Sequence, residues 1–399
     1  MWRYVVMARP KKPKYEYVEK LNLFRKRVKD IHGKYVAVYG RTPDELTEKL
    51  LEFNKQQEQG AENKDNPLFN DYAQRWMDLH SANLTFGGRT DYQSCIDCNI
   101  KPYMQGKRIK EIRPDDIREL MLGVTQKSES IYTKTYMLVK QILSSACENG
   151  YISTNPCPAM SKGGIPPRER QALTQKQIAV LLDAVEGTKA YLFCMIGLYA
   201  GLRREEILGL KWDCVHLDKT PCIDVQRALR FEHNRPVVSD RLKTKASRRV
   251  VPIPPQLVQA LQEEHMVSQS EFVIHNSENG PISGTQFKRL WNYVVRRTAK
   301  DRVYYRYVDG VKTAHHVEAK LGAQAKRGGF TYTIDFDVTP HILRHTYITN
   351  LLLAGVDVKT VQYLAGHERA KITLDIYAHL TYNRPEDILE KVNAAFDTT

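Results

Sequence analysis

The sequence predicts a multidomain chain: a small β-plus-α module, then an all-α domain, then a larger, mainly α domain with a small antiparallel β-sheet. The 399 residues exceed one usual core, at about 100 to 200 residues per domain. Two polar stretches containing Gly and Pro, residues 56–67 and 159–171, interrupt the apolar patterns. We therefore predict domains with these bounds: 1–66 including a linker, 67–160, and 170–399 after a second linker at 161–169.

The first module carries a concentration of positive charge. Residues 9–34 hold ten Lys or Arg against three Asp or Glu, a net +7. Within residues 34–57, the side chains before Gly40 alternate as in a strand, and Gly40 marks a turn. A helix is expected to start near Thr42, with Pro43 at its first position. Strands with basic and aromatic residues favour a DNA-binding module, although a solvated surface is the alternative. The candidate DNA contacts are Arg9, Lys11, Lys12, Lys14, Arg25, Lys26 and Arg27.

Local patterns assign the other two domains. Residues 68–160 show apolar residues three to four apart, which is typical of helices. In the third domain, Thr174 and Gln177 form a capping-box pattern that opens a helix. Residues 221–254 alternate apolar and polar side chains between turn residues, which predicts a short antiparallel sheet.

Charge and composition narrow the functional class. The formal net charge of +14 is spread along the chain and favours a polyanionic partner. The longest apolar run, residues 190–202, falls short of the roughly 20 residues that cross a bilayer. The first residues lack a signal-peptide pattern, so we expect a cytoplasmic protein. Seven cysteines suit reduced thiols, and we assign no chemistry to the closely spaced Cys95 and Cys98.

Two helices carry candidates for phosphate binding. In residues 201–212, Arg203 and Glu206 are three apart and share a face, so the carboxylate can orient the guanidinium. Alone, such a pair is a common solvated helix face. In residues 338–355, Thr339 and Pro340 begin a helix whose first turn carries His341 and Arg344 on one face.

A helix N-terminus with an arginine and an imidazole suits a phosphate, because unpaired N–H groups and the helix dipole add to the side-chain charge. His345 points elsewhere and is interpreted as structural. Further along, His367 follows a glycine, and Tyr377 comes ten residues later on or beside a short helix. A tyrosine in that position is a candidate covalent nucleophile.

Five of these residues, with their order, spacing and local sequences, resemble the signature of tyrosine recombinases of the phage-integrase type: Arg203 in "GLRREE", His341 and Arg344 in "HILRH", His367 in "GHE" and Tyr377 in "YAH". The resemblance covers nearly the whole chain and is strongest to integrases of phages and conjugative transposons. It implies the tyrosine recombinase fold, with an arm-type DNA-binding domain, a helical (SAM-like) core-binding domain and a catalytic domain.

The resemblance also implies the chemistry. Tyr377 would attack a phosphodiester, form a 3'-phosphotyrosyl link and free a 5'-hydroxyl, with no cofactor and no metal. Arginines suit the charge that develops on the phosphate oxygens, and histidines suit proton exchange near neutral pH. His341 is expected to handle the proton and His367 to donate to the transition state, while the arginines clamp the phosphate.

Family members place a lysine acid in a β-hairpin turn, here "RLKTKASRR". Lys243 is our choice, and Lys245 is the rival, because a sequence does not fix the register of a turn. Tyr363 and Tyr382 lie near Tyr377 but fit the spacing less well.

One segment, residues 301–336, departs from the compact family pattern, and a second lies beyond Tyr377. The pattern of residues 301–336 predicts a β-hairpin around Asp309 and Gly310. Our hypothesis is that this hairpin contacts DNA or a neighbouring subunit, and the alternative is a surface elaboration without such a contact. Residues 385–396 predict an amphipathic tail helix, packed either on its own domain or on a neighbouring protomer.

The resemblance implies double-stranded DNA as the partner, a homo-oligomer that is tetrameric in the synapse, and an excisionase and a host DNA-bending protein as accessory factors. The expected activity is integration and excision of a mobile element, next to the bacterial nucleoid. A type IB topoisomerase-like swivelase and an inactive architectural DNA-binding protein are the alternatives.

Overall fold

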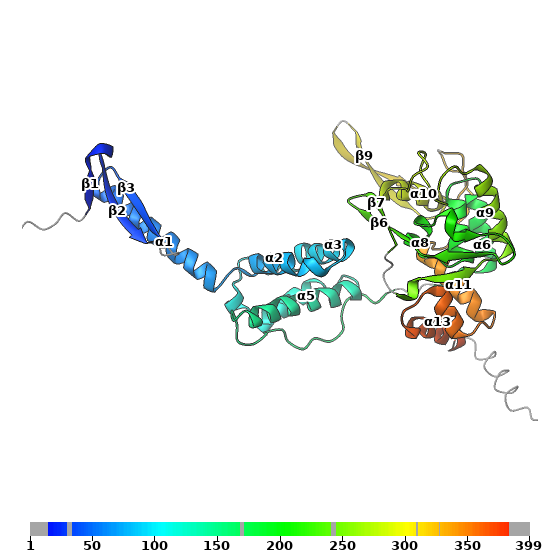
Figure 1. The fold of residues 1–399 in the computed structure, drawn as a ribbon, viewed down its shortest axis with the longest axis horizontal. Helices are drawn as coiled ribbons and strands as arrows, with labels where there is room; N and C mark the ends of the chain where they lie inside the picture. The colour runs from blue at the N-terminus through cyan, green and yellow to red at the C-terminus, as the bar shows by residue number, and fades with distance from the viewer. Residues whose placement is uncertain are drawn as a thin grey trace, which may run out of the picture. The chain divides into compact units, whose positions relative to one another are not determined.

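The chain forms two compact units, Met1–Arg168 and Glu169–Thr399, which Figure 1 colours from blue to red along the sequence. The computed structural model describes residues 15–29, 34–167, 171–240, 245–308, 310–326 and 328–382. Within these, it describes only the backbone of residues 55–64, 245, 308, 377 and 379–382. The predicted tail helix at 385–396 lies outside the described residues.

An antiparallel sheet and a helix form the N-terminal module. Its elements are β1 (Glu16–Val18), β2 (Leu23–Lys29), β3 (Tyr35–Gly40) and α1 (Pro43–Asp65), with the strands in the order β1–β2–β3. Alternation along β2 directs Phe24 and Val28 to one face, where they pack with the buried Leu46 and Leu50 of α1. The predicted strand that ends at Gly40 and the helix that follows it are confirmed.

Helix α1 continues through residues 56–65, which belong to the stretch that we predicted to be an interdomain linker. Most residues of the stretch, such as Gln, Glu, Lys and Ala, have good helix propensity, and they extend a helix that has already begun at Pro43. A missing apolar period argues against packing, but it does not argue against a solvated helix.

The rest of the first unit is helical, as predicted, with α2 (Phe69–His80), α3 (Phe86–Cys95), α4 (Pro114–Gly123) and α5 (Glu129–Glu148). Ser128 caps α5 by accepting the N–H of Ile131. The helices surround one apolar core that includes Phe69, Met77, Ile96, Ile100, Ile117, Leu120, Leu138 and Ile142. Cys95 is buried against the Thr135 hydroxyl, whereas Cys98 is exposed, so the two thiols have different environments.

The second unit contains the helices α6 (Gln175–Val185), α7 (Ala190–Tyr199), α8 (Arg204–Leu208), α9 (Pro255–Val267), α10 (Gly284–Arg296), α11 (Pro340–Leu353), α12 (Val358–Ala365) and α13 (Ala370–Tyr382). Apolar on nearly every side, α7 is almost wholly buried. Helix α11 packs so closely on it that a Cβ at Gly197 would lie 3.0 Å from Leu343. The predicted capping box of Thr174 and Gln177 opens α6.

Residues 221–254 form strands of two sheets, where we predicted one. The strands β4 (Val215–His216), β5 (Cys222–Val225) and β8 (Arg249–Pro252) pair in that order, while β6 (Ala228–Glu232) pairs only with β7 (Arg235–Ser239). His233 and Asn234 both have positive φ, 46° and 70°, as a two-residue hairpin loop requires. This tight loop closes β6 and β7 on each other as a separate hairpin.

The predicted hairpin near Gly310 is confirmed. Strands β9 (Arg302–Val308) and β10 (Val311–Val317) pair along their whole length, and the hairpin extends away from the helices of its unit in Figure 1. Exposed Tyr305 and Tyr307 lie on it. No described helix is long and apolar enough to span a membrane.

Candidate active site

Arg203 is held at the start of α8 by its own local sequence. It is the N-cap residue: Glu206 accepts the Arg203 backbone N–H at 2.8 Å and the guanidinium Nη1 at 2.6 Å. The pairing with Glu206 is confirmed, but the helix is shorter than the predicted 201–212. It begins after Arg203 and ends at Leu208, where the next residue, Gly209, is its C-cap.

Arg344 lies in the first turns of α11. As predicted, Thr339 caps this helix and Pro340 occupies its first position. The Arg344 guanidinium is buried, and it donates from Nη1 to the Gly201 carbonyl at 2.7 Å and from Nη2 to the Ala365 carbonyl. Burial, followed by the charge of nearby Arg203, lowers the pKa of Arg344 to about 9, so the side chain stays charged at neutral pH.

The C-terminus of α12 collects three arginines. The successive carbonyls of Leu364, Ala365 and Gly366 accept one guanidinium each, from Arg249, Arg344 and Arg203 respectively. The last carbonyls of a helix have no intrahelical donors, and they form the negative end of its dipole. The C-terminus of α12 therefore suits cationic donors and brings side chains from three distant parts of the sequence together.

Glu206 is the carboxylate at the centre of this group. Its side chain is 3% exposed, and Arg249 donates to both of its oxygens, at 2.9 and 3.2 Å. Burial alone would raise the pKa of Glu206, but Arg249 and the other two guanidinium groups outweigh burial and lower the pKa to about 2. Three guanidinium groups thus surround one carboxylate, and the site keeps an excess of positive charge.

Two glycines make these contacts possible. Gly201 has φ +63°, and a Cβ there would lie 2.1 Å from the ring of Tyr347, so a side chain would displace the carbonyl that Arg344 binds. Gly366 has φ +61°, and a Cβ there would lie 3.0 Å from Nη1 of Arg249. Both positions need a left-handed backbone that favours glycine.

His367 follows Gly366 directly and is buried. Its backbone N–H donates to the Gln362 carbonyl at 3.1 Å, and its ring Nδ1 lies 2.9 Å from the hydroxyl of Thr373. Burial, followed by the charge of Arg344, lowers the pKa of His367 to about 3. The imidazole is therefore neutral at pH 7, and the Thr373 hydroxyl fixes the orientation of its ring.

Replacing Thr373 by valine is expected to slow the DNA cleavage that the resemblance implies by about 5-fold, since the lost hydrogen bond contributes about 1 kcal/mol to holding the ring. Thr373 is completely buried, so valine fills the same space without contacting DNA itself. Single-turnover cleavage of a nicked duplex measures the effect. Thr373→Ser keeps the hydroxyl and is the matched control; equal rates for the two variants would contradict the assigned contact.

The histidines of α11 have different exposures. His341 is exposed in the first turn, and its proximity contributes to the low pKa of His367. His345 is half-buried. His341 therefore lies in the electrostatic neighbourhood of His367.

The remaining predicted residues fall at the limits of the described structure. Tyr377 lies on α13, one helical turn after Thr373, and its side chain lies outside the described part. Lys243 lies outside the described residues, and Lys245 begins a short 3-10 turn of which only the backbone is described there. The choice between the two lysines stays a prediction.

Only some of the predicted DNA contacts of the N-terminal module lie within the described residues. Four of them, Arg9, Lys11, Lys12 and Lys14, lie outside the described residues. The other three lie on β2 but do not share a face, since side chains alternate along a strand. Arg25 pairs with Glu16 at 2.8 Å, the Lys26 ammonium lies 5.9 Å from the ring centre of Tyr15, and Arg27 is exposed.

Sequence reasoning missed Arg249 altogether. This arginine occupies an inward position of β8, in alternation with the buried Val251, where apolar residues are usual. An arginine in such a position must pair with a buried carboxylate, and that is the signal that could have found it. Thr373 and the carbonyls of α12 gave no comparable signal, because only folding brings them to His367 and the arginines.

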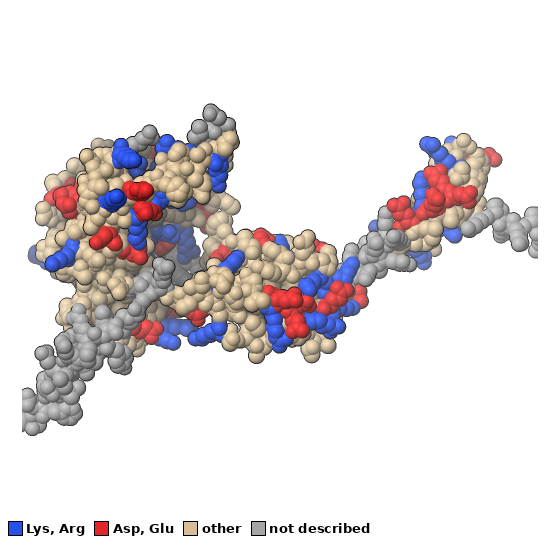
Figure 2. All heavy atoms as spheres, turned by 180° about the vertical axis from the view of Figure 1, so that it is seen from behind, with Lys and Arg blue, Asp and Glu red and all other residues tan. Residues whose placement is uncertain are grey.

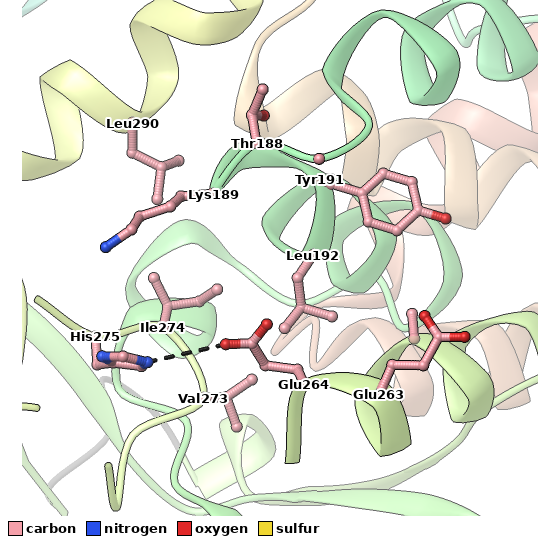
Figure 3. Close-up of a pocket in the computed structure, with 12 residues that line it drawn as sticks. Thr188, Lys189, Tyr191, Leu192, Glu263, Glu264, Val273, Ile274, His275 and Leu290 are labelled. Carbon is pink, nitrogen blue, oxygen red and sulfur yellow. Dashed lines mark ion pairs between the residues drawn. The ribbon is translucent and has the colours of Figure 1, made fainter. Parts of the chain in front are cut away.

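One cavity of the same unit lies among other residues than these. This cavity of about 420 Å³ lies between the first turn of α7, the end of α9 and α10. Figure 3 shows the carboxylates of Glu263 and Glu264 among its lining residues, with Glu264 paired to His275 at 3.8 Å. None of the predicted catalytic residues lines it. In the described residues, no group of three His, Cys, Asp or Glu side chains could hold a metal ion.

A mainly α domain with clustered arginines and a buried histidine agrees with the class that the resemblance predicts, a tyrosine recombinase. The chain belongs to the phage integrase family, whose pattern it matches over residues 171–384. Residues 68–121 match the N-terminal SAM-like domain of phage integrases. The predicted family, fold class and enzyme class are confirmed.

Relatives of known identity agree with this assignment. A tyrosine recombinase XerC-like protein of Caldanaerobacter subterraneus subsp. tengcongensis is 26% identical, over 73% of this chain and 74% of the relative. The transposase from transposon Tn916 of Enterococcus faecalis is 22% identical, over 75% and 71%.

Two solved structures share the fold. The Tn1549 transposon integrase in complex with a circular intermediate DNA has a TM-score of 0.60 at 20% identity, covering 82% of this chain and 99% of that one. A lambda integrase dimer bound to a core site has a TM-score of 0.54 at 15% identity, covering 93% and 96%. A transposon integrase and lambda integrase are thus among the fold neighbours of this chain.

Proposed function

We propose that Tyr377 attacks a scissile phosphodiester held by Arg203 and Arg344, and that this reaction integrates and excises a mobile element. One observation carries the proposal: three guanidinium groups converge on the end of α12 around a single carboxylate, Glu206. Arg203 is the most accessible of them at 34% side-chain exposure. A guanidinium has five N–H donors, so Arg203 and Arg344 have further donors beyond the two protein bonds described for each.

The proposed reaction exchanges one phosphoester for another. The Tyr377 oxygen forms a bond to phosphorus, the bond from phosphorus to the 5'-oxygen breaks, and the 5'-oxygen takes up a proton. Attack by a 5'-hydroxyl of another strand reverses these steps and releases the tyrosine. Negative charge develops on the nonbridging oxygens during each step, where fixed arginine donors are most effective.

Three further side chains have proposed roles. His341, exposed near the site, would exchange the proton of the tyrosine. His367 is neutral with its Nδ1 on Thr373, so its other ring nitrogen is suited to donate to a phosphate oxygen. Lys243 would protonate the 5'-oxygen that leaves.

The N-terminal module would bind DNA through the sheet face that α1 leaves uncovered. Alternation places Arg25, Arg27 and Lys29 on that face, opposite Tyr39, Ala37 and Tyr35 of β3. Lys and Arg side chains are scattered over each described part of the chain on the face drawn in Figure 2, so contacts with phosphate are expected from several parts of the chain. We propose a tetramer on DNA, aided by an excisionase and a host DNA-bending protein, acting in the cytoplasm at the nucleoid. Lambda integrase forms a tetramer on a Holliday junction.

Covalent trapping tests the proposal. The full chain is incubated with a nicked duplex that carries the joined ends of the element, and adducts are resolved on a denaturing gel. Wild type is expected to form an adduct and Tyr377→Phe none, because phenylalanine has no nucleophilic oxygen. Tyr363→Phe and Tyr382→Phe are the controls and should keep the adduct.

Other outcomes identify the alternatives. DNA binding without any adduct in the wild type would indicate an architectural protein. An adduct with relaxation of supercoiled DNA but no exchange between two sites would indicate a swivelase. An undiminished adduct in Tyr377→Phe would place the nucleophile elsewhere.

A further inference from the structure

Arg249 is fully enclosed by the protein at the end of α12. Its side chain is 0% exposed, whereas that of Arg203 is 34% exposed. Each Arg249 contact described is with the protein: both oxygens of Glu206, the Leu364 carbonyl at 2.7 Å and the Ser247 carbonyl at 3.0 Å. A side chain so enclosed is not placed to bind DNA directly.

Arg249 and Arg203 bridge the same two elements side by side. Arg203 joins Glu206 to the Gly366 carbonyl, and Arg249 joins Glu206 to the Leu364 carbonyl, two residues earlier. Arg249 approaches both carboxylate oxygens, so it fixes the plane of the carboxylate that orients Arg203. Its bond to Leu364 also holds the backbone just before the glycine on which Arg203 rests.

The electrostatic cost of this arrangement indicates a specific role. A buried guanidinium is expensive to desolvate, and an apolar residue at this inward strand position would usually serve stability as well or better. Arg249 also adds positive charge beside Arg203 and Arg344, which lowers the pKa of Arg344 further. Selection for stability alone would not require a third cation here.

We propose that Arg249 is a positioning residue for DNA cleavage: it fixes the Glu206 carboxylate and the end of α12, so that Arg203 is aimed at the phosphate. It acts through Arg203 and does not touch the substrate. The proposal rests on the proposed function, because it assumes that Arg203 binds the scissile phosphate.

A change of substrate separates positioning from general support of the fold. Replacing one nonbridging oxygen of the scissile phosphate by a methyl group removes its negative charge, so a methylphosphonate depends less on a well-aimed guanidinium. A defect that comes from a misdirected Arg203 should therefore shrink on this substrate. A defect from a damaged fold should stay the same on both substrates.

The experiment compares Arg249→Met with wild type in single turnover at saturating protein, using a nicked duplex with either a phosphate or a methylphosphonate at the cleavage position. On the phosphate, Arg249→Met is expected to be slower by about 100-fold, the usual cost of a small misplacement at a reacting centre. On the methylphosphonate, the ratio of wild-type to variant rates should fall at least about 10-fold. Arg203→Met should show the same reduction.

Arg248→Met is the matched control, because it removes the same charge from the neighbouring position. The Arg248 side chain is exposed and donates to the Asp240 carbonyl. Its rate ratio should not depend on the substrate. If Arg249→Met does not fold, Arg249→Lys replaces it, and the same drop in ratio is required, because one ammonium group cannot hold Glu206 and Leu364 together.

Three results are decisive. Equal defects of the Arg249 variant on both substrates, or no defect, would overturn the positioning role while Arg203→Met still shows the reduction. No adduct with the wild type on the phosphate substrate would instead refute the proposed function. A reduction shared by Arg203→Met and the Arg249 variant, but absent from Arg248→Met, supports the proposal.

Discussion

Glu206→Gln is expected to abolish detectable cleavage and to lower the free energy of unfolding of the second unit by about 3–5 kcal/mol, the usual cost of leaving buried charges without their partner. Glutamine has nearly the same shape but carries no charge. Three guanidinium groups would then face one another around a neutral amide, and Arg203 would lose its charged anchor. Urea unfolding of the full chain and single-turnover cleavage measure the two effects.

The pH dependence of the same variant checks the cause. The pKa of Glu206 is lowered from 4.5 to about 2 in the folded chain. Its charge therefore contributes stability that is complete above about pH 4.5 and is lost as the pH falls toward 2, a contribution of about 3 kcal/mol. The difference in unfolding free energy between wild type and Glu206→Gln should shrink over this range. A difference that does not change with pH would assign the loss to packing.

Arg344→Lys is expected to reduce the cleavage rate by about 10²- to 10³-fold while DNA affinity changes little. The charge remains, but one ammonium group cannot contact the Gly201 carbonyl, the Ala365 carbonyl and a phosphate at once. Single-turnover cleavage gives the rate, and fluorescence anisotropy of a labelled duplex gives the affinity. Equal cleavage by Arg344→Lys would contradict the phosphate clamp.

Local signals predicted several local features around the candidate site correctly. Thr339 and Pro340 fixed the start of α11, and a three-residue spacing joined Arg203 to Glu206, because these features depend only on neighbouring residues. The hairpin near Gly310 was equally local. Resemblance then supplied the assembly of distant residues into one site.

Long-range contacts could not be predicted in this way. Arg249 is 43 residues from Glu206 and 115 from Leu364, so nothing in its local sequence indicates either partner. The role of the α12 carbonyls is equally hidden, since backbone groups carry no residue-specific signal. The polar content of residues 56–65 did not reveal their helix, because a solvated helix and a loop have similar compositions.

Mass spectrometry of the covalent adduct tests the central claim most directly. Trypsin cleavage after Lys359, Arg369, Lys371 and Lys391 places Tyr363 in one peptide and Tyr377 with Tyr382 in another, since Arg384 precedes Pro385 and is not cleaved. Fragment ions between residues 377 and 382 then locate the nucleotide that remains after nuclease digestion of the trapped DNA. We expect the phosphodiester on Tyr377, linked to a 3'-oxygen. A nucleotide on Tyr363 or Tyr382, or on no tyrosine at all, would contradict the account.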